Sequence, residues 1–109
     1  MAQLDFNINL TPREAYNMLQ DFDSAELVYD ELKSPGEGKY IAIMVFEKYY
    51  FRSENRAALT VIIDNFHDIT SVTAIASGSS QGLIFNFDWG AGDNFVESVR
   101  KFFKDYIIE

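Results

Sequence analysis

Residues 39–51 read KYIAIMVFEKYYF, a long run that is rich in β-branched and aromatic side chains. Such a run favours a β-strand. Successive side chains of a strand point to opposite faces of its sheet, so this run presents apolar groups on both. One face carries Tyr40, Ala42, Met44, Phe46 and Tyr50, and the other carries Ile41, Ile43, Val45, Tyr49 and Phe51. We therefore expect a strand whose apolar side chains must be shielded from water on both faces of the sheet.

Turn sequences separate this strand from its neighbours. SPGEG at 34–38 precedes it and RSEN at 52–55 follows it, and both are typical of chain reversals. Alternating apolar and polar residues predict further strands at 3–10, 56–66, 69–77 and 83–89. The short turns between consecutive strands are typical of an antiparallel meander.

Residues 25–34 allow two interpretations. Asp23 with Glu26 fits the start of a second helix, whereas Leu27-Val28-Tyr29 prefers a strand. We favour the strand.

Two helices are predicted. Thr11, Pro12 and Glu14 form a capping box with proline at the first helical position, and the helix ends near 21–24. Near the C-terminus, GAG at 90–92 breaks the strand pattern and Asp93 caps an amphipathic helix over 94–108. The wet face of that helix holds opposite charges at i,i+4 spacing, namely Glu97, Lys101 and Asp105.

These elements predict one α+β domain over residues 1–109, in the order strand, helix, five strands, helix. We expect an antiparallel sheet of five to six strands with both helices on one face. At the level of topology this is similar to the helix-grip and TATA-binding-protein-like folds, a likeness that carries no function.

Composition excludes several classes of function. There are 9 basic and 17 acidic residues, a net charge of −8, so nucleic acid and anionic membrane are not expected as main partners. The absence of cysteine excludes thiol catalysis and disulfides. No signal-peptide pattern opens the sequence and no apolar run is long enough to span a bilayer, so we expect a cytoplasmic protein.

SGSSQG at 77–82 is the most site-like stretch, because its glycines allow close approach and its hydroxyls and amide can bind a polar ligand. The favoured alternative is a turn between strands with locally bonded serines. If a small molecule binds between the sheet and the last helix, we expect it to contact Ser77, Ser79, Ser80, Gln81, Phe85, Phe87, Trp89 and Phe103.

Serine hydrolysis is the less favoured reading. Ser79 or Ser80 would need His67 as base, itself oriented by Asp64 or Asp68, and nothing in the sequence brings these groups together. We therefore assign no catalytic residue and expect the protein not to be an enzyme.

Metal and cofactor sites are not expected either. The acidic pairs Asp21 with Asp23 and Asp30 with Glu31 lack the glycine and distal glutamate of a calcium loop. One histidine and no cysteine leave too few ligands for zinc. At 90–93, GAGD precedes a helix start that could bind phosphate, but Asp93 would repel an anion there.

The apolar surplus of 39–51 gives two hypotheses for function. If one sheet face is uncovered, a second copy is the most economical partner, and the protein is a homodimeric binding or regulatory module. Its interface would then contain Ile41, Ile43, Val45, Tyr49 and Phe51. Alternatively, the helices arch away from the sheet and leave an aromatic pocket for a small apolar ligand.

Three stretches together resemble an uncharacterised domain-of-unknown-function family of short bacterial proteins. They are 45–56 (VFEKYYFRSENR), 73–81 (TAIASGSSQ) and the helix after Gly92. The resemblance covers nearly the whole chain. It implies a small cytoplasmic α+β domain and supplies no catalytic residues.

Overall fold

The computed structural model describes residues 2–50, 55–79 and 89–108. Its elements, in chain order, are β1 (Ala2–Ile8), α1 (Pro12–Leu19), β2 (Glu26–Gly36), β3 (Lys39–Tyr50), β4 (Asn55–Asp64), β5 (Thr70–Ser79), α2 (Trp89–Phe102), the 3-10 turn η1 (Lys104–Tyr106) and β6 (Ile107–Ile108). The α+β prediction is confirmed, and residues 26–36 form a strand, as we favoured. Neither helix of this described part is long and apolar enough to cross a membrane.

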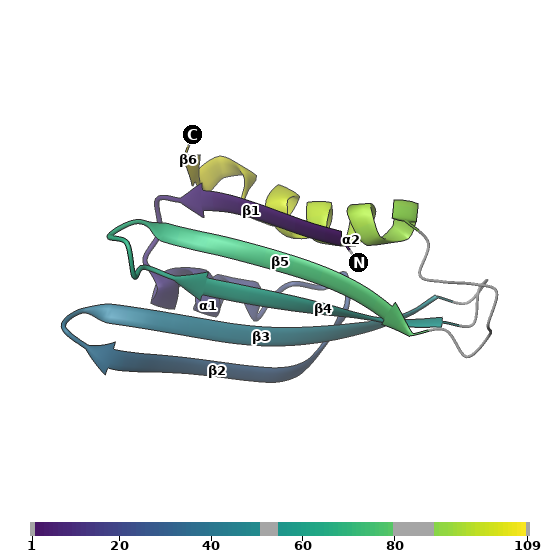
Figure 1. Cartoon of the computed structure of the whole chain (residues 1–109), viewed down its shortest axis with the longest axis horizontal. Coiled ribbons are helices and arrows are strands. Elements are labelled where there is room, and N and C mark those ends of the chain that lie inside the picture. The colour runs from purple at the N-terminus through teal and green to yellow at the C-terminus, as the bar shows by residue number, and fades with distance from the viewer. Residues whose placement is uncertain (1, 51–54, 80–88, 109) are drawn as a thin grey trace.

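The six strands form one antiparallel sheet in the order β2-β3-β4-β5-β1-β6. Consecutive hairpins build the meander from β2 to β5, and β1 then pairs with β5 so that Ala2 lies opposite Ala76. Figure 1 shows β1 between the meander and the short β6. No comparison tests the helix-grip likeness, which stays a prediction.

Alternate residues of the central strands build the core. Burial is complete, at 0 % exposure, for Ala42, Met44, Phe46, Leu59, Val61, Ile63, Val72, Ala74 and Ala76. In the register of the sheet, Met44, Val61 and Ala74 lie side by side, so these residues share one face. Both helices pack on that face, as predicted, because their buried side chains belong to the same cluster.

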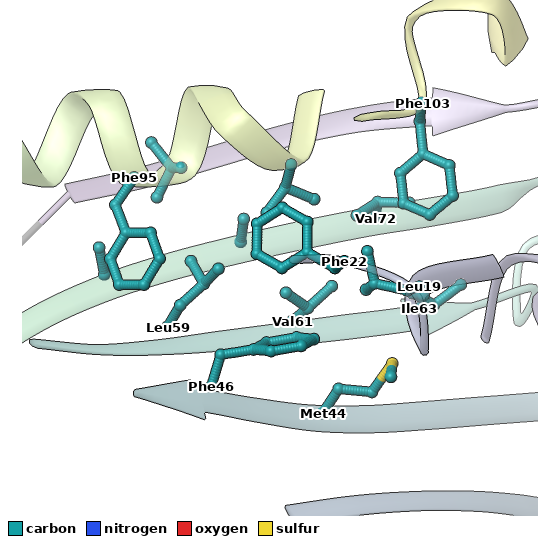
Figure 2. Close-up of a cluster of buried hydrophobic side chains, with 14 of the residues drawn as sticks. Leu19, Phe22, Met44, Phe46, Leu59, Val61, Ile63, Val72, Phe95 and Phe103 are labelled. Atoms are coloured by element: carbon teal, nitrogen blue, oxygen red, sulfur yellow. The ribbon is translucent and has the colours of Figure 1, made fainter. Parts of the chain in front are cut away.

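Phe22 connects the two helices. It follows α1 in the chain, and its ring lies 5.1 Å from that of Phe46 on the sheet and 5.8 Å from that of Phe102 on α2. Both contacts are edge-to-face, the arrangement that aromatic quadrupoles prefer. Figure 2 shows this ring between the helices and the sheet, with Leu19 and Phe103 nearby. The aromatic residues therefore hold both helices to the same layer.

The capping box is present as predicted. Glu14 N–H donates to Thr11 Oγ1 at 3.1 Å, and Thr11 N–H donates to Glu14 Oε1 at 2.9 Å. Two N–H groups that have no partner inside the helix are satisfied in this way.

Replacing Thr11 with alanine is expected to lower the free energy of unfolding by about 1 kcal/mol, because the N–H of Glu14 loses its acceptor. Urea denaturation followed by circular dichroism measures this change. Ser24→Ala, which changes an exposed serine outside any helix, is the control and should leave the denaturation midpoint in place. An equal loss in the two variants would contradict a capping role.

The C-terminal helix differs from its prediction at both ends. It starts at Trp89 and contains Gly90 to Asp93, so Asp93 is not its cap. Glycines in the first turn of a helix reduce its stability only a little, because the N–H groups of that turn have no partners within the helix. The helix stops at Phe102, and Ile107 and Ile108 pair with β1 because that pairing satisfies β-branched residues better than a further helical turn. The predicted strand at 83–89 lies outside the described residues except for Trp89, which belongs to α2.

Candidate functional site

The face of the sheet opposite the helices carries an uncovered group of apolar side chains. It consists of Tyr29, Ile41, Ile43, Val45, Ile62 and Ile75, and is called the apolar stripe below. Strand register makes it continuous, since Tyr29 lies beside Val45 and Ile43 beside Ile62. None of the six belongs to the core cluster or packs against it. Among the described elements, no helix or strand lies over the stripe.

The stripe is bordered on one side by polar side chains that bond to one another. Thr73 Oγ1 donates to Asp5 Oδ1 at 2.7 Å, and Ser71 Oγ donates to Asn7 Oδ1 at 3.0 Å. Gln3 Nε2 also donates to Asp5, at 3.0 Å. Two of these bonds link β1 to β5, and the third lies within β1. The apolar stripe is therefore the part of this face whose burial against a partner would lower the free energy.

Opposite charges lie at both ends of the stripe. Lys33 Nζ is 3.4 Å from Glu31 Oε1 at one end, and an Arg56 guanidinium nitrogen is 3.5 Å from Glu47 Oε1 at the other. Tyr29 Oη donates to Glu31 Oε2 at 2.8 Å. This hydrogen bond raises the pKa of Tyr29 above its ordinary value, because it stabilises the protonated phenol beside a carboxylate. The charged rim is thus mixed in sign.

The predicted interface residues fall on this face where the structure describes them. Ile41, Ile43 and Val45 are half-buried there, and Tyr49 is 48 % exposed further along β3. Phe51 lies outside the described residues. Sequence reasoning missed Tyr29, Ile62 and Ile75, which join the stripe only once strand register is known. The alternation of side chains along β2, β4 and β5 indicates which residues share a face of each strand. It does not indicate which strands are neighbours in the sheet.

The residues predicted to bind a small molecule are only partly described. Ser77 is exposed and pairs with Ala58 on the open face, whereas Phe103 is fully buried on the helix side. The sheet therefore separates these two. Ser79 ends β5 and Trp89 begins α2, while Ser80, Gln81, Phe85 and Phe87 lie outside the described residues.

The space expected for an apolar ligand is filled in the described part of α2. Phe95 is 3 % exposed, and Val99 and Phe103 are fully buried against the sheet. The Phe103 ring lies 5.1 Å from the Phe102 ring and 6.4 Å from the Phe6 ring. Close packing of this kind leaves no room for a ligand between these side chains.

The hydrolase hypothesis does not fit the positions of His67 and Ser79. His67 lies in the turn before β5, and Ser79 is the last residue of that ten-residue strand. A strand of this length separates its ends by about 30 Å, far beyond hydrogen-bond reach. Ser80 lies outside the described residues.

The acidic pairs do not converge on a site. Asp30 lies beside Met44 on the helix side and accepts a hydrogen bond from Gln20 at 2.9 Å, whereas Glu31 lies beside Ile43 on the open face. In the part of the chain that the structure describes, no cluster of three metal-ligating side chains occurs.

No curated protein and no solved structure matches the chain. A family model does match, over residues 1–107, and its description is "Family of unknown function (DUF6054)". This agrees with the resemblance drawn from the sequence and adds no activity or ligand. The chain belongs to the DUF6054 family of unknown function.

Proposed function

We propose that the chain is a cytoplasmic, non-enzymatic binding or regulatory module that forms a homodimer by packing its apolar stripe against that of a second copy. The supporting observation is that the stripe spans four adjacent strands and no described element lies over it. Burial of such a surface gains free energy in proportion to the apolar area removed from water.

The size of the face suits a dimer. Strands rise about 3.4 Å per residue and lie about 4.8 Å apart, so the four strands of the stripe, about ten residues long, cover roughly 650 Å², and the shorter β1 brings the face to roughly 760 Å². Each partner of a stable interface contributes about 800 Å². An apolar centre with a polar rim is also the usual composition of such interfaces. The open face therefore offers enough area for one partner of the same kind.

A second copy fits the charges of the rim. Each end of the stripe carries a cation and a carboxylate, Lys33 with Glu31 and Arg56 with Glu47. A two-fold axis sets one face against an identical face. Because each end of the stripe carries both signs of charge, no two-fold arrangement of the two copies places only like charges opposite one another. Two sheets packed in this way lie about 10 Å apart with their strands within about 30°.

Sedimentation velocity at micromolar concentrations tests the proposal. We expect the wild-type chain to sediment at twice its mass of 12.5 kDa. Ile43→Lys places a charge in the centre of the stripe and is expected to give a folded monomer, because the charge cannot be buried against a second apolar face. Thr60→Arg, beside Val45 on the same face, is a second variant that removes no apolar contact from the fold.

Asn17→Lys is the matched control, because it adds the same charge at an exposed position of α1 on the other side of the sheet. This variant is expected to remain a dimer. A wild-type monomer throughout the concentration range, or dimers of both open-face variants, would overturn the proposal. Near-ultraviolet circular dichroism of each variant reports that the fold is retained.

A further inference from the structure

A basic pocket lies at the C-terminal end of α2. It has a volume of about 370 Å³ and is lined by Glu97, Arg100, Lys101, Lys104 and Ile107. The first four residues follow helical spacing, so they lie along one side of α2 and η1. Ile107 of β6 supplies the apolar wall. The pocket is shallow and open to solvent, and its three cations are exposed side chains, so a bound ligand would stay partly in contact with water.

The charge of this pocket is opposite to that of the chain. The protein has a net charge of −8 and only 9 basic residues, yet three of them line this pocket against one carboxylate. The lining residues alone therefore carry a net charge of +2, and Asp105, next to Lys104 in the chain, is not among them. A surface with an excess of one sign of charge attracts ions of the opposite sign.

Only one of the three cations of the pocket forms an ion pair within the described part of the chain. Arg100 is 3.6 Å from Glu97, in place of the Glu97–Lys101 pair that the sequence suggested. Lys101 and Lys104 have no ion pair or hydrogen bond among the described residues. Arg100 and Lys101, in the last turn of α2, also complement the negative end of the helix dipole. Lys104 follows the helix, so stabilisation of α2 does not account for it.

We propose that the basic pocket binds a phosphate monoester: its three cations hold the phosphoryl group, and Ile107 contacts the apolar end of the ester. The net charge of +2 on the lining residues matches the dianion that a phosphate monoester forms at neutral pH. The planar guanidinium of Arg100 is suited to two parallel hydrogen bonds with phosphoryl oxygens, and lysines act there as point charges. A single carboxylate would leave one of the two charges unmatched.

The pocket is independent of the proposed dimer. Ile107 lies beside the buried Ile8 in the sheet register, which places it on the helix side. The apolar stripe occupies the other side of the sheet. Loss of one function therefore need not affect the other, and each has its own measurement.

Titration of the full chain with phenyl phosphate, followed by amide chemical shifts in two-dimensional NMR, tests the proposal. Ionic strength is held constant with sodium chloride. We expect saturable shifts at residues 97–107, with a dissociation constant in the millimolar range. Inorganic phosphate should shift the same amides more weakly, and uncharged benzyl alcohol should not shift them.

Lys101→Gln with Lys104→Gln is expected to weaken phenyl phosphate binding by about tenfold or more, since two charge-assisted contacts are lost. Lys104→Gln alone lies outside α2 and should weaken binding several-fold without affecting the helix. Lys33→Gln, a lysine on the open face, is the matched control and should bind as the wild type does. Wild-type affinity in the two pocket variants, absence of saturable shifts, or equal shifts with benzyl alcohol would overturn the proposal.

Discussion

Replacing Phe46 with alanine is expected to lower the free energy of unfolding by about 3–5 kcal/mol. The side chain is fully buried on β3, and its ring meets the edge of Phe22, which in turn contacts α2 through Phe102. Truncation removes the buried ring and leaves a cavity at the point where both helices meet the sheet. The free energy of unfolding of a small domain is about 5–15 kcal/mol, so this one substitution would remove a large part of it. Urea denaturation measures the loss.

Phe66→Ala is the matched control for this prediction. It makes the same chemical change at a side chain that is 43 % exposed in the turn after β4. We expect a change within about 0.5 kcal/mol, as for other surface substitutions. Similar losses at the two positions would show that the contacts of Phe46 do not have the importance assigned to them.

The second large effect is expected for Val61→Asp, which should abolish cooperative unfolding at neutral pH. Val61 has no exposed surface and lies between Met44 and Ala74 in the sheet. A carboxylate there has no cation or donor beside it, so it must either lose its hydration or take up a proton with a raised pKa. Either outcome costs several kcal/mol. Loss of the near-ultraviolet circular dichroism signal is the measurement.

Ile62→Asp, one residue further along β4, is expected to keep its fold. Ile62 lies between Ile43 and Thr73 on the open face, where a carboxylate stays in contact with water in the monomer. The two variants differ by one position in sequence and by the face to which the side chain points. If Ile62→Asp also loses its cooperative transition, the assignment of the two faces of the sheet is incorrect.

The local features of this fold were predictable because their determinants lie close together in sequence. The bonds between Thr11 and Glu14 join residues three positions apart, and the β-branched and aromatic composition of β3 is visible in twelve consecutive residues. The start of α2 was predicted too late because the glycines at 90 and 92 were taken as a break. The β6 strand was missed because its determinants are distant in sequence. Ile107 and Ile108 continue a helical apolar pattern, and their strand partners, Ile8 and Asn7, lie about a hundred residues earlier.

The residues of the candidate sites also fall into a group that was predictable from the local sequence and a group that was not. The residues Ile41, Ile43 and Val45 were predicted for the open face from the alternation of one strand. The remaining members of the apolar stripe depend on register between strands, which periodicity does not specify. The basic pocket was missed because Lys101 was assigned to the polar face of a helix, and because Ile107, which forms the wall of the pocket, was assigned to the apolar face of that helix.

The place of β1 in the sheet also affects how the chain acquires its structure during synthesis. β1 is synthesised before its neighbour β5, which begins only at Thr70. At roughly 5–20 residues per second, β1 therefore waits several seconds for that neighbour. The hairpins from β2 to β5 can zip up locally in the meantime, whereas closure of the sheet by β1 depends on contacts that are distant in sequence and slow to form. Until β5 is complete, the alternating apolar side chains of β1 therefore stay uncovered in the growing chain.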